Sequence, residues 1–159
     1  VMEHGKTVIF PGSFDPFTRG HAAVVAEALR IFDRVVIGVG DNIAKNGLLP
    51  IEKRMELIKD LYADDPRVEV GAYDSLTGDF ARAWGAKVIV RGVRTGYDIE
   101  YEQNMAAINK QLYPDITTVI LCTPAELSHI SSSVVRELLS FGRNVDEFMP
   151  EGTDINKYL

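Results

Sequence analysis

Short apolar runs recur along the chain at intervals that suit the strands of one sheet. They lie at residues 7–10, 34–40, 68–70, 88–90 and 117–122. Most are continuous rather than alternating, which is typical of strands that are covered on both faces. The pattern therefore predicts five buried strands.

Helical periodicity fills the intervals between these runs. After residue 21, Val24, Val25, Ala28 and Leu29 fall on one face of a helix, with polar positions opposite. We expect helices that begin at His21 and at Pro50, helices over 76–84, 98–113 and 131–141, and short helical turns at 145–148 and 153–158. Alternating strands and helices predict a parallel sheet with right-handed crossovers. We expect one doubly wound α/β domain over 1–159, with residues 1–6 as a tail and 150–159 as a C-terminal extension.

The first strand runs directly into a turn rich in glycine and proline, Pro11-Gly12-Ser13-Phe14-Asp15-Pro16-Phe17-Thr18-Arg19-Gly20-His21. Ligands of parallel sheets bind at such strand-to-helix junctions. A helix that begins near His21 offers free N–H groups and a positive dipole end, which favour an anion. The turn therefore predicts a phosphate site, although Asp15 or Thr18 could equally serve as an ordinary helix cap.

Three later loops at the same edge of the sheet add cations and hydroxyls. They supply Lys45, the pair Arg91 and Arg94 around a glycine, and the hydroxyl-rich run 128–133. Arginine suits phosphate because its planar group donates two parallel hydrogen bonds. Each signal has a plain alternative: Lys45 as a solvated charge, the arginines paired with Asp98, Glu100 or Glu102, and the serines as a helix cap. Four loops that converge on one edge favour the phosphate interpretation.

Composition and charge narrow the class of protein. Hydrophobic residues make up 46% and charged residues 25% of the 159, as in soluble globular domains. A formal net charge of -6 argues against nucleic acid or an anionic membrane as a partner. Neither a signal peptide nor a membrane span is evident, so we expect a cytoplasmic protein. The one cysteine, Cys122, cannot form an internal disulfide, and its apolar neighbours predict a buried thiol.

The turn carries a family resemblance. Ser13-Phe14-Asp15-Pro16 followed by Thr18-Arg19-Gly20-His21 resembles the T/HxGH signature of the nucleotidyltransferase superfamily, which implies a Rossmann-like nucleotidyltransferase fold. Further segments make nearly the whole chain, from 7 to about 150, resemble bacterial phosphopantetheine adenylyltransferase. They are the Lys45 loop, Phe80-Ala81-Arg82, Arg91-Gly92-Val93-Arg94, Asp98 with Glu100-Tyr101-Glu102, and Ile130-Ser131-Ser132-Ser133.

The resemblance implies a role for each matching residue. Catalysis would rest on His21, Ser13, Lys45 and Arg91, with His21 stabilising the α-phosphate in the transition state. The residues expected around ATP are Ser13, Phe14, His21, Gly92, Val93, Arg94, Glu102 and the run Leu127, Ser128, His129, Ile130, Ser131, Ser132 and Ser133. The residues expected around phosphopantetheine are Ser13, Lys45, Leu76, Thr77 and Arg91.

The resemblance also implies the reaction and the assembly. The acceptor phosphate would attack the α-phosphate of ATP and give dephospho-coenzyme A and pyrophosphate. Mg²⁺ would accompany the triphosphate with no metal site built by the protein, and the chain would form a homohexamer. Feedback by coenzyme A is left open. Two other functions remain: a related enzyme that uses nicotinamide mononucleotide or glycerol 3-phosphate, and a non-catalytic nucleotide-binding module.

Overall fold

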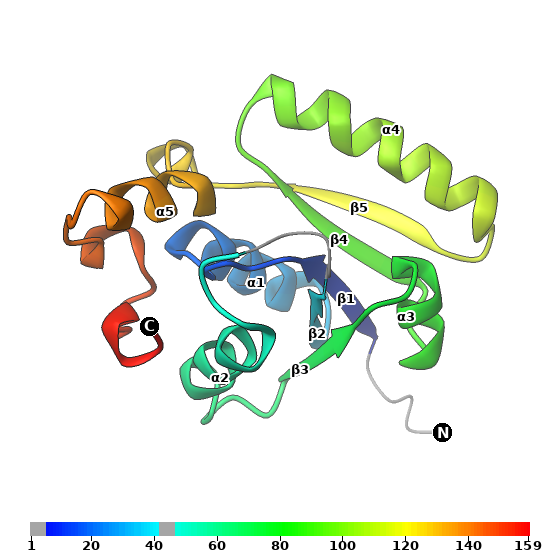
Figure 1. Ribbon diagram of the computed structural model, residues 1–159. Helices are drawn as coiled ribbons and strands as arrows, with labels where there is room; N and C mark the ends of the chain where they lie inside the picture. Colours follow the sequence, from blue (N-terminus) through cyan, green and yellow to red (C-terminus); the bar gives the residue numbers. More distant parts are fainter. Residues whose placement is uncertain (1–5, 42–46) are drawn as a thin grey trace.

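A five-stranded parallel sheet in the order β3-β2-β1-β4-β5 forms the centre of the molecule (Figure 1). The structure is a computed structural model that describes residues 6–41 and 47–159. The strands are β1 (Thr7–Gly12), β2 (Arg34–Gly40), β3 (Val68–Tyr73), β4 (Val88–Val93) and β5 (Thr117–Cys122). Because β1 lies between β2 and β4, the turn that follows it is at the middle of the carboxyl edge. The predicted parallel, doubly wound fold is confirmed.

Helices cover both faces of the sheet. They are α1 (Arg19–Ile31), α2 (Ile51–Leu61), α3 (Thr77–Ala83), α4 (Gly96–Leu112) and α5 (Ser132–Ser140), with 3₁₀ turns at Ala125–Leu127, Asp146–Phe148 and Ile155–Lys157. Alternate residues of β1 serve the two faces: Val8 and Phe10 pack with α1, α2 and α5, whereas Ile9 packs on the side of α3. Helix α4 runs beside β5 (Figure 1). The double coverage explains why the strands are continuously apolar.

The fourth strand is longer than its apolar run predicts. We expected Arg91, Gly92 and Val93 in a loop, but they continue β4 and pair with Ile120, Leu121 and Cys122 of β5. Arg91 ends the apolar run, but its backbone can still pair with β5, because the side chain has its own hydrogen-bond partners in Glu102 and Pro11. Strand β3 likewise extends to Tyr73 rather than stopping at residue 70.

The expectation of a buried Cys122 is wrong. The residue is exposed, because it ends β5, which is an edge strand with one neighbour. Apolar neighbours in the sequence do not ensure that the last residue of a strand is buried.

Residues 150–159 pack against the core rather than hanging free. Ile155 and Tyr158 belong to the same buried cluster as β1, and the Tyr158 hydroxyl donates to Asp60 Oδ2 of α2 at 2.6 Å. Over the part of the chain that the structure describes, no helix combines the length and apolarity needed to cross a membrane.

Candidate active site

Two adjoining cavities open at the carboxyl edge of the sheet, where β1 and β4 end. Their volumes are about 510 Å³ and 400 Å³. Five residues line both: Pro11, Gly12, Ser13, Arg91 and Glu102. A molecule in each cavity would therefore meet the other at this shared wall.

The turn after β1 is shaped by aromatic packing. Phe14 has a φ of 49°, in the left-handed region that non-glycine residues rarely adopt. This conformation brings its ring to 5.1 Å from that of Phe10 and 5.3 Å from that of Phe17. Gly12 is required by the same packing, since a Cβ there would lie 2.8 Å from the Phe14 ring. A glycine at position 12 therefore leaves room for the Phe14 ring.

Helix α1 begins with a reciprocal cap between Thr18 and His21. Thr18 is the capping residue, and its backbone N–H donates to Nδ1 of His21 at 2.9 Å. Asp15, the alternative cap, instead accepts from the backbone N–H groups of Leu48 and Leu49. Because Nδ1 of His21 accepts a hydrogen bond, the proton of the neutral ring is on Nε2.

His21 stays neutral at physiological pH. Burial, and then the positive charges of Arg91 and Arg94, lower the pKa of His21 to about 3. The ring is enclosed by Phe14 and Phe17, with centroids 5.0 Å and 5.3 Å away. His21 lines the smaller cavity, so it presents a fixed, uncharged N–H donor there.

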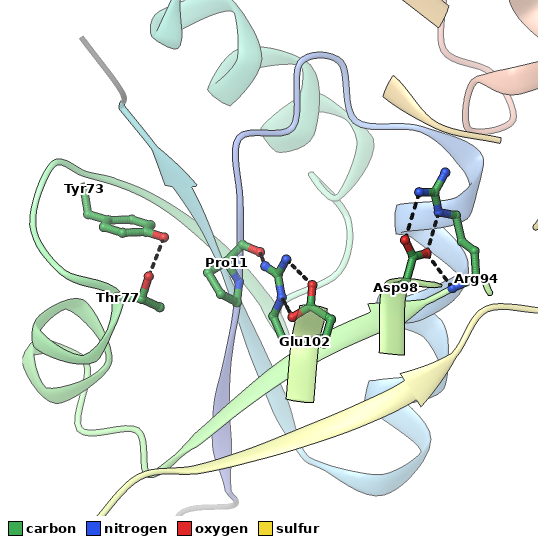
Figure 2. Close-up of polar contacts among 7 residues, drawn as sticks. Pro11, Tyr73, Thr77, Arg94, Asp98 and Glu102 are labelled. Carbon is green, nitrogen blue, oxygen red and sulfur yellow. Dashed lines mark hydrogen bonds and ion pairs between the residues drawn. The ribbon is translucent and has the colours of Figure 1, made fainter. Parts of the chain in front are cut away.

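Arg91 and Glu102 form a bidentate ion pair in the shared wall. Arg91 Nε and Nη2 donate to the two carboxylate oxygens of Glu102 at 2.8 Å each, and Nη1 donates to the carbonyl of Pro11 (Figure 2). Burial alone would lower the pKa of Arg91, but the hydrogen bonds and charge of Glu102 raise the pKa above its ordinary value. The Glu102 side chain is 8% exposed. The pair keeps a permanent cation beside Ser13 and fixes α4 to the end of β1.

A second cluster of donors lines the smaller cavity opposite the turn. Arg94 pairs with Asp98 at 3.0 Å (Figure 2). Burial alone would raise the pKa of Asp98, but hydrogen bonds from Arg94 lower it. The lining also includes Ile130, Ser131, Ser132 and Ser133 at the start of α5. Backbone N–H groups at a helix start and a nearby guanidinium suit a chain of phosphates.

The serines divide between capping and other contacts. Ser131 is the cap of α5 and accepts from the N–H of Val134 at 3.2 Å. Ser132 donates to the carbonyl of Pro16 at 2.9 Å, which joins α5 to the turn after β1. Ser133 accepts from Arg136. The capping alternative therefore holds for Ser131 alone.

The larger cavity lies between the β3–α3 connection and α4. Its lining includes Tyr73 and Thr77, whose hydroxyls are 3.1 Å apart (Figure 2), and Met105, Ala106 and Asn109 of α4. The lining thus combines apolar and polar side chains, which suits a ligand with amide groups on an aliphatic chain.

Not every predicted site residue lies in the cavities. Thr77 lines the larger one, but Leu76 is absent from both described linings and is 60% exposed. Phe14 and Gly92 line the smaller cavity, and a Cβ at Gly92 would lie 2.6 Å from Cγ2 of Val24. Four other residues placed near ATP by the resemblance are likewise absent from the described linings: Val93, Leu127, Ser128 and His129. Lys45 lies outside the described residues.

Comparison with known proteins shows the family of the chain. Residues 9–138 match the family model described as cytidylyltransferase-like. A phosphopantetheine adenylyltransferase of Phocaeicola vulgatus is 56% identical over 95% of this chain and 99% of its own. Its counterpart from Bacteroides thetaiotaomicron is 50% identical over the same shares, and that from Clostridium botulinum is 42% identical over 92% of each chain. The chain belongs to the phosphopantetheine adenylyltransferase family.

A solved structure with a similar fold is a bifunctional NMN adenylyltransferase/ADP ribose pyrophosphatase from Francisella tularensis. The TM-score is 0.70 at 17% identity, over 92% of this chain and 45% of the longer one. At this identity the likeness concerns the fold alone.

The sequence did not single out several residues of the cavities, among them Tyr73, Met105 and Asn109 of the larger one and Arg136 of the smaller one. Arg136 lines the smaller cavity and donates to the carbonyl of Asp15 at 2.8 Å and to Ser133 at 3.2 Å. It lies one helical turn after Ser132, so it returns to the face on which the serine run begins. That spacing is the signal that could have found it.

Metal-ligating side chains do not gather in the part of the site that the structure describes. Among the residues that the structure describes, no group of three or more His, Cys, Asp or Glu side chains could hold a metal ion.

Proposed function

We propose that the protein transfers the adenylyl group of ATP to 4'-phosphopantetheine and releases pyrophosphate. The observation that carries this proposal is the pair of cavities that share the wall of Ser13, Arg91 and Glu102. One cavity has the donors that a triphosphate requires, and the other has the mixed lining that a pantetheine arm requires. The relatives named above support the same acceptor.

The reaction would take place at the shared wall. A phosphate oxygen of the acceptor forms a bond to the α-phosphorus of ATP, and the bond from that phosphorus to the bridging oxygen breaks. The acceptor phosphate is already ionised at neutral pH, so no strong general base is needed. Catalysis then consists of positioning and charge stabilisation, as is usual in phosphoryl transfer.

Each nearby group would have a separate task. His21 donates from Nε2 to an oxygen of the α-phosphate, where negative charge develops. Arg91 and Lys45 hold the acceptor phosphate, and Ser13 orients it. Arg94, Glu102 and the start of α5 hold the nucleotide. Mg²⁺ would arrive with the triphosphate and neutralise part of its charge.

A comparison of acceptors tests the function. The protein is mixed with ATP and Mg²⁺ and, separately, with phosphopantetheine, nicotinamide mononucleotide or glycerol 3-phosphate, and pyrophosphate release is followed. We expect release with phosphopantetheine and little with the others. Release with another acceptor alone would favour a related transferase, and none with any acceptor would favour a binding module.

The assembly and setting of the enzyme follow from the resemblance as further proposals. They are a homohexamer, a cytoplasmic location and regulation by coenzyme A. Light scattering at micromolar concentration tests the first, and pyrophosphate release in the presence of added coenzyme A tests the last.

A further inference from the structure

Two charged residues outside both cavities hold the backbone around Ser13. Asp15 is 5% exposed, and its carboxylate accepts from the N–H groups of Leu48 at 2.7 Å and Leu49 at 2.8 Å. These residues lie 33 and 34 positions further along the chain. The contact fixes the start of α2 against the turn after β1.

Arg54 of α2 also binds main chain around Ser13. Its Nε donates to the carbonyl of Leu49 at 3.0 Å, and Nη1 donates to the carbonyls of Ser13 at 2.9 Å and Gly40 at 3.4 Å. Gly40 ends β2, and Leu49 directly precedes Pro50, the cap of α2. One guanidinium therefore joins both ends of the β2–α2 connection to Ser13.

Asp15 and Arg54 have opposite charges, yet they do not pair with each other. The salt bridges among the described residues do not include one between them. Instead the carboxylate binds two backbone N–H groups and the guanidinium binds three carbonyls. Hydrogen bonds that involve a charged partner are about twice as strong as neutral ones. Both charges therefore serve to fix main chain.

The fixed main chain borders the cavities, although the two charged side chains do not. Ser13 lines both cavities, and Gly40 and Asp41 line the larger one. Neither Asp15 nor Arg54 is in either described lining. Any effect of these residues on the reaction would thus be transmitted through the position of Ser13 and of the rim at the end of β2.

We infer that Asp15 and Arg54 are positioning residues for adenylyl transfer, which together hold the Ser13 backbone and the end of β2 at the acceptor side of the site. This inference rests on the proposed function. The donors of the nucleotide side, on α5 and after β4, have no side-chain contact with Arg54 among the described hydrogen bonds. The Asp15 carboxylate likewise accepts from Leu48 and Leu49, and the bond from Arg136 of α5 goes to the Asp15 backbone carbonyl, which a change of the side chain leaves in place. The acceptor side should consequently be affected more than ATP.

Three substitutions test the inference from different directions. Asp15→Asn keeps the size of the side chain but turns an amide N–H₂ toward a backbone donor. Arg54→Lys keeps the charge but cannot reach three carbonyls in a planar arrangement. Gly47→Ala keeps both charged groups, and its new methyl would collide with the Asp15 carboxylate. All three should displace the same main chain.

Matched controls carry the same chemical changes far from the cavities. Asp33→Asn alters a carboxylate that accepts the backbone N–H of Lys6 at 2.8 Å. Arg82→Lys alters a guanidinium that pairs with Asp115 on the surface. A general loss of stability or charge would appear in the controls as well.

The measurements are kcat, the KM for each substrate, ATP affinity by calorimetry, and the melting temperature. We expect kcat/KM for phosphopantetheine to fall about 10- to 100-fold, the range for a reacting group displaced by up to about 1 Å, with ATP affinity within about twofold. The double variant of Asp15→Asn and Arg54→Lys should lose less than the product of the single losses, because both act on one segment.

Several outcomes would overturn the inference. Values of kcat/KM within twofold of the parent, equal effects on both substrates, or losses matched by the controls would each reduce Asp15 and Arg54 to a structural role. If Asp15→Asn does not fold, Arg54→Lys and Gly47→Ala decide the question. A parent protein without activity toward phosphopantetheine would refute the proposed function instead, and this is measured first.

Discussion

The hydrogen bond from the Thr18 backbone to Nδ1 of His21 leads to the sharpest prediction. It fixes the proton on Nε2, and burial together with Arg91 and Arg94 lowers the ring's pKa to about 3. At pH 6, a group with that pKa is about 0.1% protonated, whereas a histidine at the ordinary value of about 6.5 is mostly protonated. The donor is therefore the neutral ring at every pH at which the enzyme is assayed.

Removal of this donor should slow chemistry without weakening nucleotide binding. Loss of one preorganised transition-state donor typically lowers kcat by about 10²–10³. We expect a fall of that size for His21→Ala, with ATP affinity by calorimetry near that of the parent. Turnover close to normal, in a variant with an unchanged circular dichroism spectrum, would show that His21 is not the donor.

The protonation state can be observed directly. Long-range ¹H–¹⁵N spectra distinguish the two ring nitrogens, and the His21 signals are those that His21→Gln removes. We expect an Nε2–H pattern that does not titrate between pH 5 and 8. A titration near pH 6.5, or a proton on Nδ1, would refute the argument from the cap.

The lowered pKa of His21 also makes the folded protein less stable at low pH. The unfolded chain binds a proton at His21 below about pH 6.5, and the folded chain does so only near pH 3. Unfolding is therefore favoured progressively as the pH falls through this window. Urea denaturation at pH 7.5 and 5 should show a larger loss for the parent than for His21→Gln.

Three further substitutions test other parts of the site and fold. Arg91→Met should lower the free energy of unfolding, measured by urea denaturation, by about 3 kcal/mol because it leaves the Glu102 carboxylate unpaired. The double variant Arg91→Met/Glu102→Met should regain much of that stability. The KM for phosphopantetheine should stay raised in both variants. Ser133→Asp should keep the contact with Arg136 and melt no lower than the parent. It should bind ATP much more weakly, because the new carboxylate would face the phosphates. An unchanged ATP affinity by calorimetry would show that α5 is not part of the nucleotide site. Tyr158→Phe should cost about 1 kcal/mol through the lost hydrogen bond to Asp60, and a smaller change would mean that apolar packing alone holds residues 150–159.

Much of the fold was accessible from the sequence because buried parallel strands leave continuous apolar runs. The runs located all five strands, and the turn after β1 lies where the two cavities meet. The ends of elements were less accessible, as Arg91 within β4 illustrates, since ladder hydrogen bonds do not depend on side-chain polarity. Exposure of Cys122 depended on which strand is at the edge, and that is a property of the assembled sheet.

The contacts around Ser13 were inaccessible for a different reason. Asp15 and Thr18 are both good caps, and the sequence offers no ground for choosing between them. In the folded protein the N–H groups of Leu48 and Leu49 bind the Asp15 carboxylate, and Thr18 is the residue that caps α1. Local sequence therefore predicts that a polar group is needed at a turn, but not which distant backbone it will serve.

The packing of Ile155 and Tyr158 against β1 has a consequence for biosynthesis. Both belong to the buried cluster that includes Val8 and Phe10, so the core around β1 is complete only after residues 155–158 have been synthesised. At about 5–20 residues per second, the ribosome needs roughly 8 to 30 seconds to add some 150 residues. For that interval the apolar centre of the sheet is incompletely covered. Exposed apolar surface of this kind is what makes incompletely folded chains prone to aggregate.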